Sequence, residues 1–170
     1  MDQRVLFEIR RAGPSDAEAI ASAHLDSIHS IGPSYYEPAI VRDWGAHVEA
    51  GLYLRAMRRG EVFFVAIDQE DDASSTVLGF STHAQYGTDH GVGVYVRGSA
   101  ARRGVGSALL RAAEADAIAS HASSLEIDAS LAAVDFYKRH GFIETSRGSH
   151  RLPSGRSMSC VFMKKALTPS

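Results

Sequence analysis

The sequence contains a single cysteine, Cys160, in 170 residues, and this scarcity excludes an internal disulfide framework. A lone thiol is typical of a reducing compartment, so we expect the protein in the cytoplasm. Cys160 falls within the strand expected over residues 157–164. We interpret it as a buried strand residue, with a catalytic thiol as the alternative.

Long apolar runs and a strong charge of one sign are also missing. No stretch approaches the length of about 18 apolar residues that a membrane span requires, and the N-terminal residues lack the apolar centre of a signal peptide. The 18 basic and 20 acidic side chains give a net charge of −2. We therefore expect neither a membrane nor a nucleic acid as a partner.

Linkers, repeats and low-complexity segments are absent as well, which favours one domain. The chain is 45% hydrophobic and 22% charged, as in an ordinary globular protein. Strand-like and helix-like segments alternate along it. We therefore expect a single domain over residues 1–170, with a frayed tail from about residue 167.

What the sequence does contain is a strand, a basic glycine-bearing turn and a helix in direct succession. Residues 94–110 read VYVRGSAARRGVGSALL, and the amphipathic helix is expected from Ser107. The first amides of a helix bind anions, and glycines let a phosphate come close to the backbone. The basic side chains around the turn are Arg97, Arg102, Arg103 and Arg111. This arrangement predicts a pyrophosphate site.

The glycine spacing separates this turn from two common phosphate loops. No Gly-Lys-Ser/Thr triplet of a Walker loop is present, and the dinucleotide pattern G-x-G-x-x-G also fails. The order x-x-x-G-x-G at residues 101–106 resembles instead the pyrophosphate loop of the GNAT-type N-acetyltransferase superfamily, (Gln/Arg)-x-x-G-x-(Gly/Ala). Ala101 stands where the family has Gln or Arg, but most contacts of that loop come from backbone N–H groups. An ordinary strand-to-helix connection with two glycines is the alternative.

A second segment, residues 125–142, strengthens the resemblance. A strand run is followed by a helix expected over residues 130–140, and a glycine stands where a helix C-terminal cap belongs. This string is similar to the second cofactor motif of the family and follows the loop in the family's order. In element order the resemblance extends over residues 9–165. The matching residues are Ala133, Phe136, Tyr137, Gly141 and Phe142.

The resemblance implies an α/β fold in which helices flank a mixed sheet of about six or seven strands. In that fold two neighbouring parallel strands splay apart, and the pantetheine arm of the cofactor enters the gap. These strands would be residues 92–96 and 125–128, with a loop over residues 85–91 before the first. Gly91 and Gly93 weaken the first strand, which suits a ligand that approaches its backbone. A β-bulge without function is the alternative.

The resemblance further implies an acetyl-CoA-dependent N-acetyltransferase that needs no metal. An amine of an unidentified small molecule or peptide would attack the thioester directly in a ternary complex. The acid that protonates the leaving thiolate would be Tyr137, a phenol that is protonated at neutral pH, with simple packing as the alternative. A backbone N–H near Tyr95 or Val96 would bind the developing oxyanion. The cofactor residues implied are Tyr95, Val96, Arg102, Arg103, Gly104, Val105, Gly106, Ser107, Ser130, Ala133, Phe136 and Tyr137.

The general base is the least determined role. Relatives often carry a Glu on the strand before the loop, but residues 92–96 contain no acid. His90 has a suitable ordinary pKa, and we assign it as the base, with His83, Asp89 or water as alternatives. Ser130 stands where many relatives carry an Asn that touches the pantetheine arm. It either takes that role or caps the helix that follows.

The acceptor pocket is expected beside the first helices of the chain. Tyr35, Tyr36 and Trp44 follow the break at residues 32–33, and aromatic rings beside carboxylates suit a cationic amine. Asp128 either faces this pocket or braces a turn. Aromatic side chains that only pack a lid segment are the alternative.

Two other functional classes stay open. An acyl-CoA sensor without catalysis is favoured by Ala101 and by the missing strand carboxylate, whereas Tyr137 favours an enzyme. A nucleotide or sugar-phosphate enzyme would explain the anion loop but not residues 133–142. The partners expected are acetyl-CoA and an amine acceptor, and a homodimer is a compatible assembly.

Overall fold

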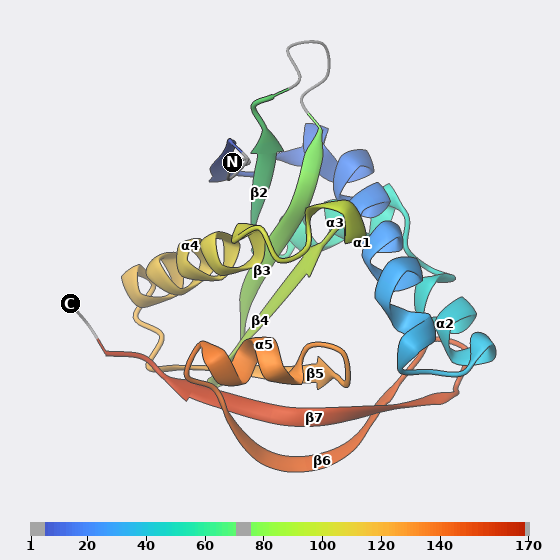
Figure 1. Ribbon diagram of the computed structural model, residues 1–170. Coiled ribbons are helices and arrows are strands. Elements are labelled where there is room, and N and C mark those ends of the chain that lie inside the picture. The colour runs from blue at the N-terminus through green and yellow to red at the C-terminus, as the bar shows by residue number, and fades with distance from the viewer. Residues whose placement is uncertain (1–5, 71–75, 169–170) are drawn as a thin grey trace.

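The computed structural model describes residues 6–70 and 76–168, which form one seven-stranded sheet with helices on both faces (Figure 1). The strands are β1 (Phe7–Arg11), β2 (Val62–Asp68), β3 (Val77–Tyr86), β4 (Asp89–Val96), β5 (Ser124–Ser130), β6 (Ile143–Arg151) and β7 (Ser157–Ala166). The α-helices are α1 (Ala17–Ile31), α2 (Pro38–Gly45), α3 (Ala50–Arg58), α4 (Val105–Ala119) and α5 (Val134–Arg139). Short 3-10 turns lie at Pro14–Asp16, Gly32–Ser34 and Gly98–Ala100. The predicted α/β fold with a mixed sheet is confirmed.

The sheet opens between β4 and β5, its two central strands, which run parallel. The strand order is β1-β2-β3-β4-β5-β7-β6, and every neighbouring pair is antiparallel except β4 and β5. In the described chain β4 and β5 share one registered pair, Gly91 with Glu126. By contrast, β5 pairs with β7 along its whole length, from Ser124 to Ser130. The predicted splay is therefore confirmed, and it opens toward the carboxyl ends of β4 and β5.

Two apolar layers hold the helices against the sheet. One layer joins α1 and α3 to β2 and β3 through Ile20, Tyr53, Phe63, Val65 and Phe80. On the other face α4 packs with Val105, Leu109 and Leu110, and α5 contributes Tyr137. On this face α4 contacts β2, β3 and β4, and Figure 1 shows its N-terminal end in front of the sheet. Since both layers are close to fully buried, the positions of the helix ends around the splay are well defined.

Several predicted boundaries were wrong by a few residues. The expected loop over residues 85–91 is a tight hairpin instead, because β3 runs to Tyr86 and β4 begins at Asp89. The helix expected from Ser107 begins at Val105, and the one expected over residues 130–140 is the shorter α5. Of the predicted tail, residues 169–170 lie outside the described part. Leu167 is held in place, since its N–H donates to the Ser123 carbonyl at 2.9 Å.

Cys160 lies in β7 and is 3% exposed, as expected for a buried strand residue. Burial raises the pKa of its thiol, and Asp128 raises it further. A raised pKa disfavours the nucleophilic thiolate. As for membrane insertion, no helix in the described ranges has both the length and the apolar character needed to cross a bilayer.

Candidate active site

A cleft of ≈ 860 Å³ runs through the gap between β4 and β5. One end is formed by the loop before α4, the middle by β4, β5 and α5, and the other end by the chain around α2 and the start of β2. Its lining includes Tyr35, Trp44, Glu61, Thr82, Tyr95, Val96, Arg102, Gly104, Gly106, Ser107, Asp128, Ser130, Ala133, Phe136 and Tyr137. Most of the residues predicted for the cofactor and two of the three predicted aromatic residues therefore meet in one cavity.

The end of the cleft expected to bind an anion lies at the N-terminus of α4. Gly104 is the N-cap residue with φ 81°, a left-handed conformation, and it offers no side-chain cap to the helix. The first turn carries no acidic residue. A Cβ at Gly106 would lie 3.2 Å from the Phe136 ring, so the backbone passes close to α5 here. The first amides of α4 thus open into the cleft without a competing side-chain acceptor, as an anion site requires.

The basic side chains around the loop do not all face the cleft. Arg102 lines it, with a positive φ of 63°, whereas Arg103 is exposed outside it. Val105 is 1% exposed and packs in the core, so it can offer only its backbone. Arg97 turns toward α1, where it donates to the Val77 carbonyl at 2.7 Å and to the Ser22 hydroxyl at 2.9 Å. Arg97 therefore anchors the loop to β3 and α1 on the side away from the cleft.

His140 connects the loop to α5 and was not singled out from the sequence. Its Nε2 lies 2.9 Å from the Ser107 hydroxyl, and its Nδ1 lies 2.8 Å from the Phe136 carbonyl. The bond to Ser107 joins residues 33 positions apart, so no local pattern could have indicated it. It fixes the direction of the Ser107 hydroxyl beside the first turn of α4.

Tyr137 lies at the middle of the cleft. The side chain is 2% exposed, and its hydroxyl oxygen accepts a hydrogen bond from the Val94 N–H at 3.1 Å. Burial raises the pKa of this phenol well above its usual value near 10, and the charge of Tyr95 raises it further. The phenol is therefore protonated over the whole physiological range, as an acid needs to be.

The two backbone amides considered for an oxyanion site face opposite ways. N–H groups alternate along a strand, and the Val94 N–H points toward α5. The Arg97 N–H points the other way, to the Leu78 carbonyl of β3 at 2.8 Å. The Val96 N–H therefore shares the direction of Val94 and faces the gap, while the Tyr95 N–H faces β3. Tyr95 still lines the cleft with its ring, which stacks on Phe80.

The end of the cleft around α2 and the start of β2 is aromatic and acidic. Tyr35, which is 49% exposed, and Trp44 both belong to the lining. Glu61 and Asp89 line the same end, and the Thr82 hydroxyl donates to Glu61 Oε1 at 2.7 Å. Asp128 also lines the cleft and lies 3.6 Å from His150 Nδ1. Of the alternatives for Asp128, the structure therefore places it on the cleft.

Tyr36 lies outside its predicted pocket, and of the two roles predicted for Ser130 the structure excludes helix capping. The Tyr36 hydroxyl donates to the Ser159 carbonyl at 2.7 Å and accepts the Leu131 N–H at 2.8 Å, and the residue is not part of the cleft lining. It ties the start of α2 to β5 and β7, which is a structural role. Ser130 lines the cleft as the last residue of β5, and α5 begins at Val134 without a side-chain cap. Helix capping by Ser130 is therefore wrong.

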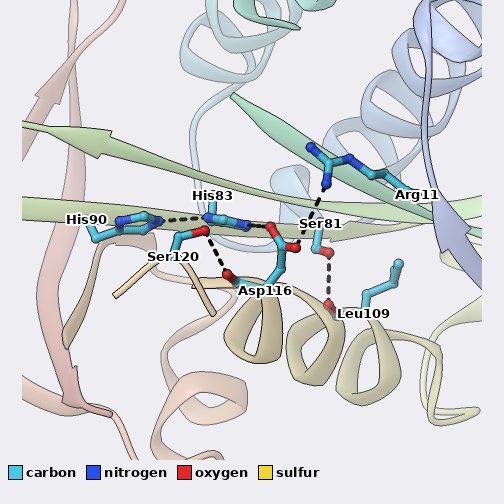
Figure 2. A network of polar contacts seen from close by, with 7 residues as sticks. All are labelled: Arg11, Ser81, His83, His90, Leu109, Asp116 and Ser120. Atoms are coloured by element: carbon cyan, nitrogen blue, oxygen red, sulfur yellow. Dashed lines mark hydrogen bonds and ion pairs between the residues drawn. The ribbon is translucent and has the colours of Figure 1, made fainter. Parts of the chain in front are cut away.

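His90, the predicted base, lies outside the cleft. Because the hairpin is tight, His90 falls inside β4, is 8% exposed, and faces α4 (Figure 2). Its Nε2 lies 2.7 Å from His83 Nδ1, and His83 Nε2 lies 2.7 Å from Asp116 Oδ2. Burial lowers the pKa of His90, and His83 lowers it further. Neither histidine lines the cleft, so this buried network fastens the hairpin to α4.

The described ranges contain no group of three or more His, Cys, Asp or Glu side chains arranged to hold a metal ion.

Comparison with known proteins connects the cleft to one family. A model described as an acetyltransferase (GNAT) domain matches residues 34–165. YafP, an uncharacterized N-acetyltransferase of Escherichia coli K12, is 24% identical over 136 residues, or 80% of this chain and 81% of YafP. A GCN5-related N-acetyltransferase from Rhodopseudomonas palustris is 25% identical, covers 94% of this chain and 95% of its own, and superposes with a TM-score of 0.81. The PaiA N-acetyltransferase of Thermoplasma acidophilum, solved with coenzyme A, is 18% identical with a TM-score of 0.74, over 95% of this chain and 99% of its own.

Proposed function

The chain belongs to the GNAT family of acetyltransferases, which are acetyl-CoA-dependent enzymes, and we propose that it acetylates a primary amine of a small molecule or peptide by direct attack in a ternary complex. The observation that carries this proposal is the single cleft through the β4–β5 gap. An anion site lies at one end of it, acids and aromatic rings lie at the other, and Tyr137 lies between them. Both substrates can therefore occupy the cleft at once.

The residues present fit acetyl-CoA as the first substrate. Coenzyme A carries a pyrophosphate, and the uncapped first turn of α4 offers amides of the kind that bind phosphate groups. Arg102 adds positive charge at the same end. Ser130 and Ala133 line the path from this end toward Tyr137, where the pantetheine arm would pass. The Thermoplasma relative of the same fold was solved with coenzyme A, which supports this choice of ligand.

Acetyl-CoA supplies the thioester, and two groups of the chain assist the transfer. The Val96 N–H faces the gap and is the donor that we assign to the developing oxyanion. The Tyr137 hydroxyl has its lone pair occupied by the Val94 N–H, which leaves its own proton free to be donated. We assign Tyr137 as the acid that protonates the leaving thiolate.

The acceptor is proposed to be a cationic amine. Glu61, Asp89 and Asp128 bring negative charge to the acceptor end, and Tyr35 and Trp44 bring ring faces. Carboxylates attract an ammonium group, and aromatic faces bind it by cation–π interaction. His150 lies against Asp128, and the other basic residues of the lining, Arg102, Arg139 and His140, belong to the loop before α4 and to the end of α5.

One experiment separates this enzyme from its alternatives. Release of free thiol from acetyl-CoA is measured with a library of primary amines, beside thermal shifts with acetyl-CoA, ATP and NAD. We expect stabilisation by acetyl-CoA alone and thiol release with a cationic amine. Stabilisation without turnover by any amine would indicate the acyl-CoA sensor instead. Stabilisation by ATP or NAD would indicate a nucleotide enzyme.

Two further proposals concern the compartment of the protein and its oligomeric state. The free thiol of Cys160 suits a reducing compartment, and we propose the cytoplasm. A homodimer is compatible with the fold, because β6 is an edge strand whose residues are all exposed, among them Ile143 at 67%. Light scattering after size-exclusion chromatography measures this assembly directly.

A further inference from the structure

A carboxylate next to β2 reaches the cleft, although residues 92–96 of β4 carry no acid. Glu61 stands immediately before β2, after a turn in which Gly60 adopts φ 93°. Its backbone N–H donates to the Ala56 carbonyl at 3.1 Å, so the end of α3 fixes its position. Its side chain lines the acceptor end of the cleft. The backbone of Glu61 is thus held in place, and its carboxylate lies at the substrate cavity.

Two glycines of β4 leave room for this carboxylate. Gly91 and Gly93 line the cleft, so β4 presents no side chain between Asp89 and Tyr95 on this face. Thr82 of β3 pairs directly with Gly93, and its hydroxyl donates to Glu61 Oε1 at 2.7 Å. The carboxylate is therefore drawn across β3 toward the bare backbone of β4. In relatives that carry a Glu on the strand equivalent to β4, the side chain of that strand would fill the space that Glu61 enters here.

The bond to Thr82 engages only one oxygen of the carboxylate. The Thr82 hydroxyl donates to Oε1, and Oε2 accepts no hydrogen bond from the described residues. The negative charge of Glu61 acts on its neighbours, since it contributes to the raised pKa of Tyr86 and of Tyr95, where burial is the larger cause. Asp89, the first residue of β4, is a further carboxylate in the cleft lining. Glu61 therefore has one carboxylate oxygen, Oε2, free to meet a substrate in the cavity.

We propose, resting on the acetyltransferase function above, that Glu61 is the general base of the reaction and that Thr82 positions it. Glu61 Oε2 takes one proton from the acceptor ammonium, which leaves a neutral amine. The nitrogen lone pair forms the bond to the acetyl carbon, and the carbon–sulfur bond breaks with its electron pair on sulfur. Tyr137 protonates the sulfur and regains a proton from the nitrogen, and Glu61 releases its own proton to solvent. The products are the amide, free thiol and one proton.

The test compares Glu61→Gln and Glu61→Asp with the wild type, with the best amine from the thiol-release screen. We expect Glu61→Gln to lower kcat by at least about 100-fold near neutral pH, and Glu61→Asp by less. The rate of Glu61→Gln should rise steadily with pH, because the fraction of neutral amine increases, while the wild type levels off earlier. Acetyl-CoA affinity, measured by calorimetry, should stay within about twofold of the wild type in both.

Two further variants separate catalysis from structure. Glu49→Gln makes the same change at an exposed residue outside the cleft and should leave kcat and its pH profile unchanged. Thr82→Val should lower kcat and shift the pH profile, and Thr82→Ser, which keeps the hydroxyl, should restore both. A folded Glu61→Gln with wild-type kcat and pH profile overturns the proposal, and so does a rise in amine KM alone. Absence of thiol release by the wild type overturns the proposed function together with it.

Discussion

The Tyr137 hydroxyl accepts the Val94 N–H at 3.1 Å, and this bond joins α5 to β4 where β4 leaves β5. In a continuous sheet that N–H would donate to the neighbouring parallel strand. The splay removes that acceptor, and the phenol oxygen replaces it inside a nearly closed site. The Tyr137 side chain thus accepts the hydrogen bond of the Val94 N–H, and it also places a hydroxyl proton in the gap between β4 and β5.

Tyr137→Phe should separate these two roles. The ring and its packing remain, while the Val94 N–H loses its acceptor, at a cost of roughly 1 kcal/mol in the free energy of unfolding. We expect kcat to fall by about 10- to 100-fold with little change in acetyl-CoA affinity. Steady-state kinetics and chemical denaturation measure the two effects. An unchanged kcat, with chemistry shown to be rate-limiting, would leave solvent as the proton donor.

The pH profile gives an independent check on the same residue. Burial raises the pKa of Tyr137 above its usual value near 10. The phenol should therefore keep its proton up to about pH 10, and no decline in rate below that pH should depend on it. The contrary result would be a wild-type rate that declines near neutral pH and a Tyr137→Phe rate that does not. The phenol would then ionise more easily than its burial indicates.

Gly104 offers a charge test of the anion site with a matched control. A Cβ at Gly104 meets nothing within 4 Å, and Asp and Asn both tolerate its left-handed φ of 81°. Gly104→Asp should weaken acetyl-CoA binding at least about tenfold relative to Gly104→Asn, or roughly 1.4 kcal/mol, because the added charge repels phosphate. Calorimetry measures both dissociation constants. Equal affinities would place the pyrophosphate elsewhere.

Trp44→Ala should affect the acceptor and spare acetyl-CoA. Trp44 lines the acceptor end and packs edge-on against Tyr36 at 5.8 Å. Removal of its ring face should raise the amine KM roughly five- to tenfold. The control is Leu52→Ala on α3, a partly exposed apolar residue outside the cleft, which should leave both KM values unchanged. A matching rise in both KM values in Trp44→Ala would indicate general destabilisation.

His90→Gln tests the correction of the predicted base. Because His90 is buried against His83 on the α4 face, we expect kcat within about twofold of the wild type and a lower melting temperature. Loss of the bond between the imidazoles should cost about 1 kcal/mol or more. Kinetics and thermal unfolding on the same samples decide this. A large loss of kcat with an unchanged melting temperature would return His90 to the reaction.

His24 should make stability depend on pH. Its Nε2 is buried without a hydrogen-bond partner among the described residues, and burial lowers its pKa from 6.5 to about 4. Between these values the unfolded chain binds a proton that the folded chain does not, so the free energy of unfolding falls as the pH decreases from about 6.5 toward 4. The loss approaches roughly 3 kcal/mol. Urea titrations at several pH values measure it.

The matched variants for this effect lie on the same helix. His24→Gln should reduce the slope of stability against pH, and His29→Gln, at an exposed position of α1, should leave the slope as in the wild type. Equal slopes in His24→Gln and the wild type would show that His24 is not the group responsible.

Local sequence determined the parts of the site that depend on backbone conformation. The glycines at 104 and 106 before an amphipathic run require a turn and a helix start, and the segment around Phe136 and Tyr137 ends at a glycine with φ 88°. These features depend on neighbouring residues, because short-range sterics govern turns and helix caps. They were sufficient to predict the family, and the loop and Tyr137 that they singled out both line the cleft.

The approach of Glu61 to the cleft was decided only by tertiary structure. Glu61 and Thr82 lie 21 residues apart, and they meet because β2, β3 and β4 pair in one register. The same register turns His90 toward α4, since successive side chains of a strand point to opposite faces. A shift of one residue would exchange the two faces, and the tight hairpin between Tyr86 and Asp89 excludes that shift. Sequence patterns could locate the strands, but only their pairing shows which carboxylate reaches the substrate.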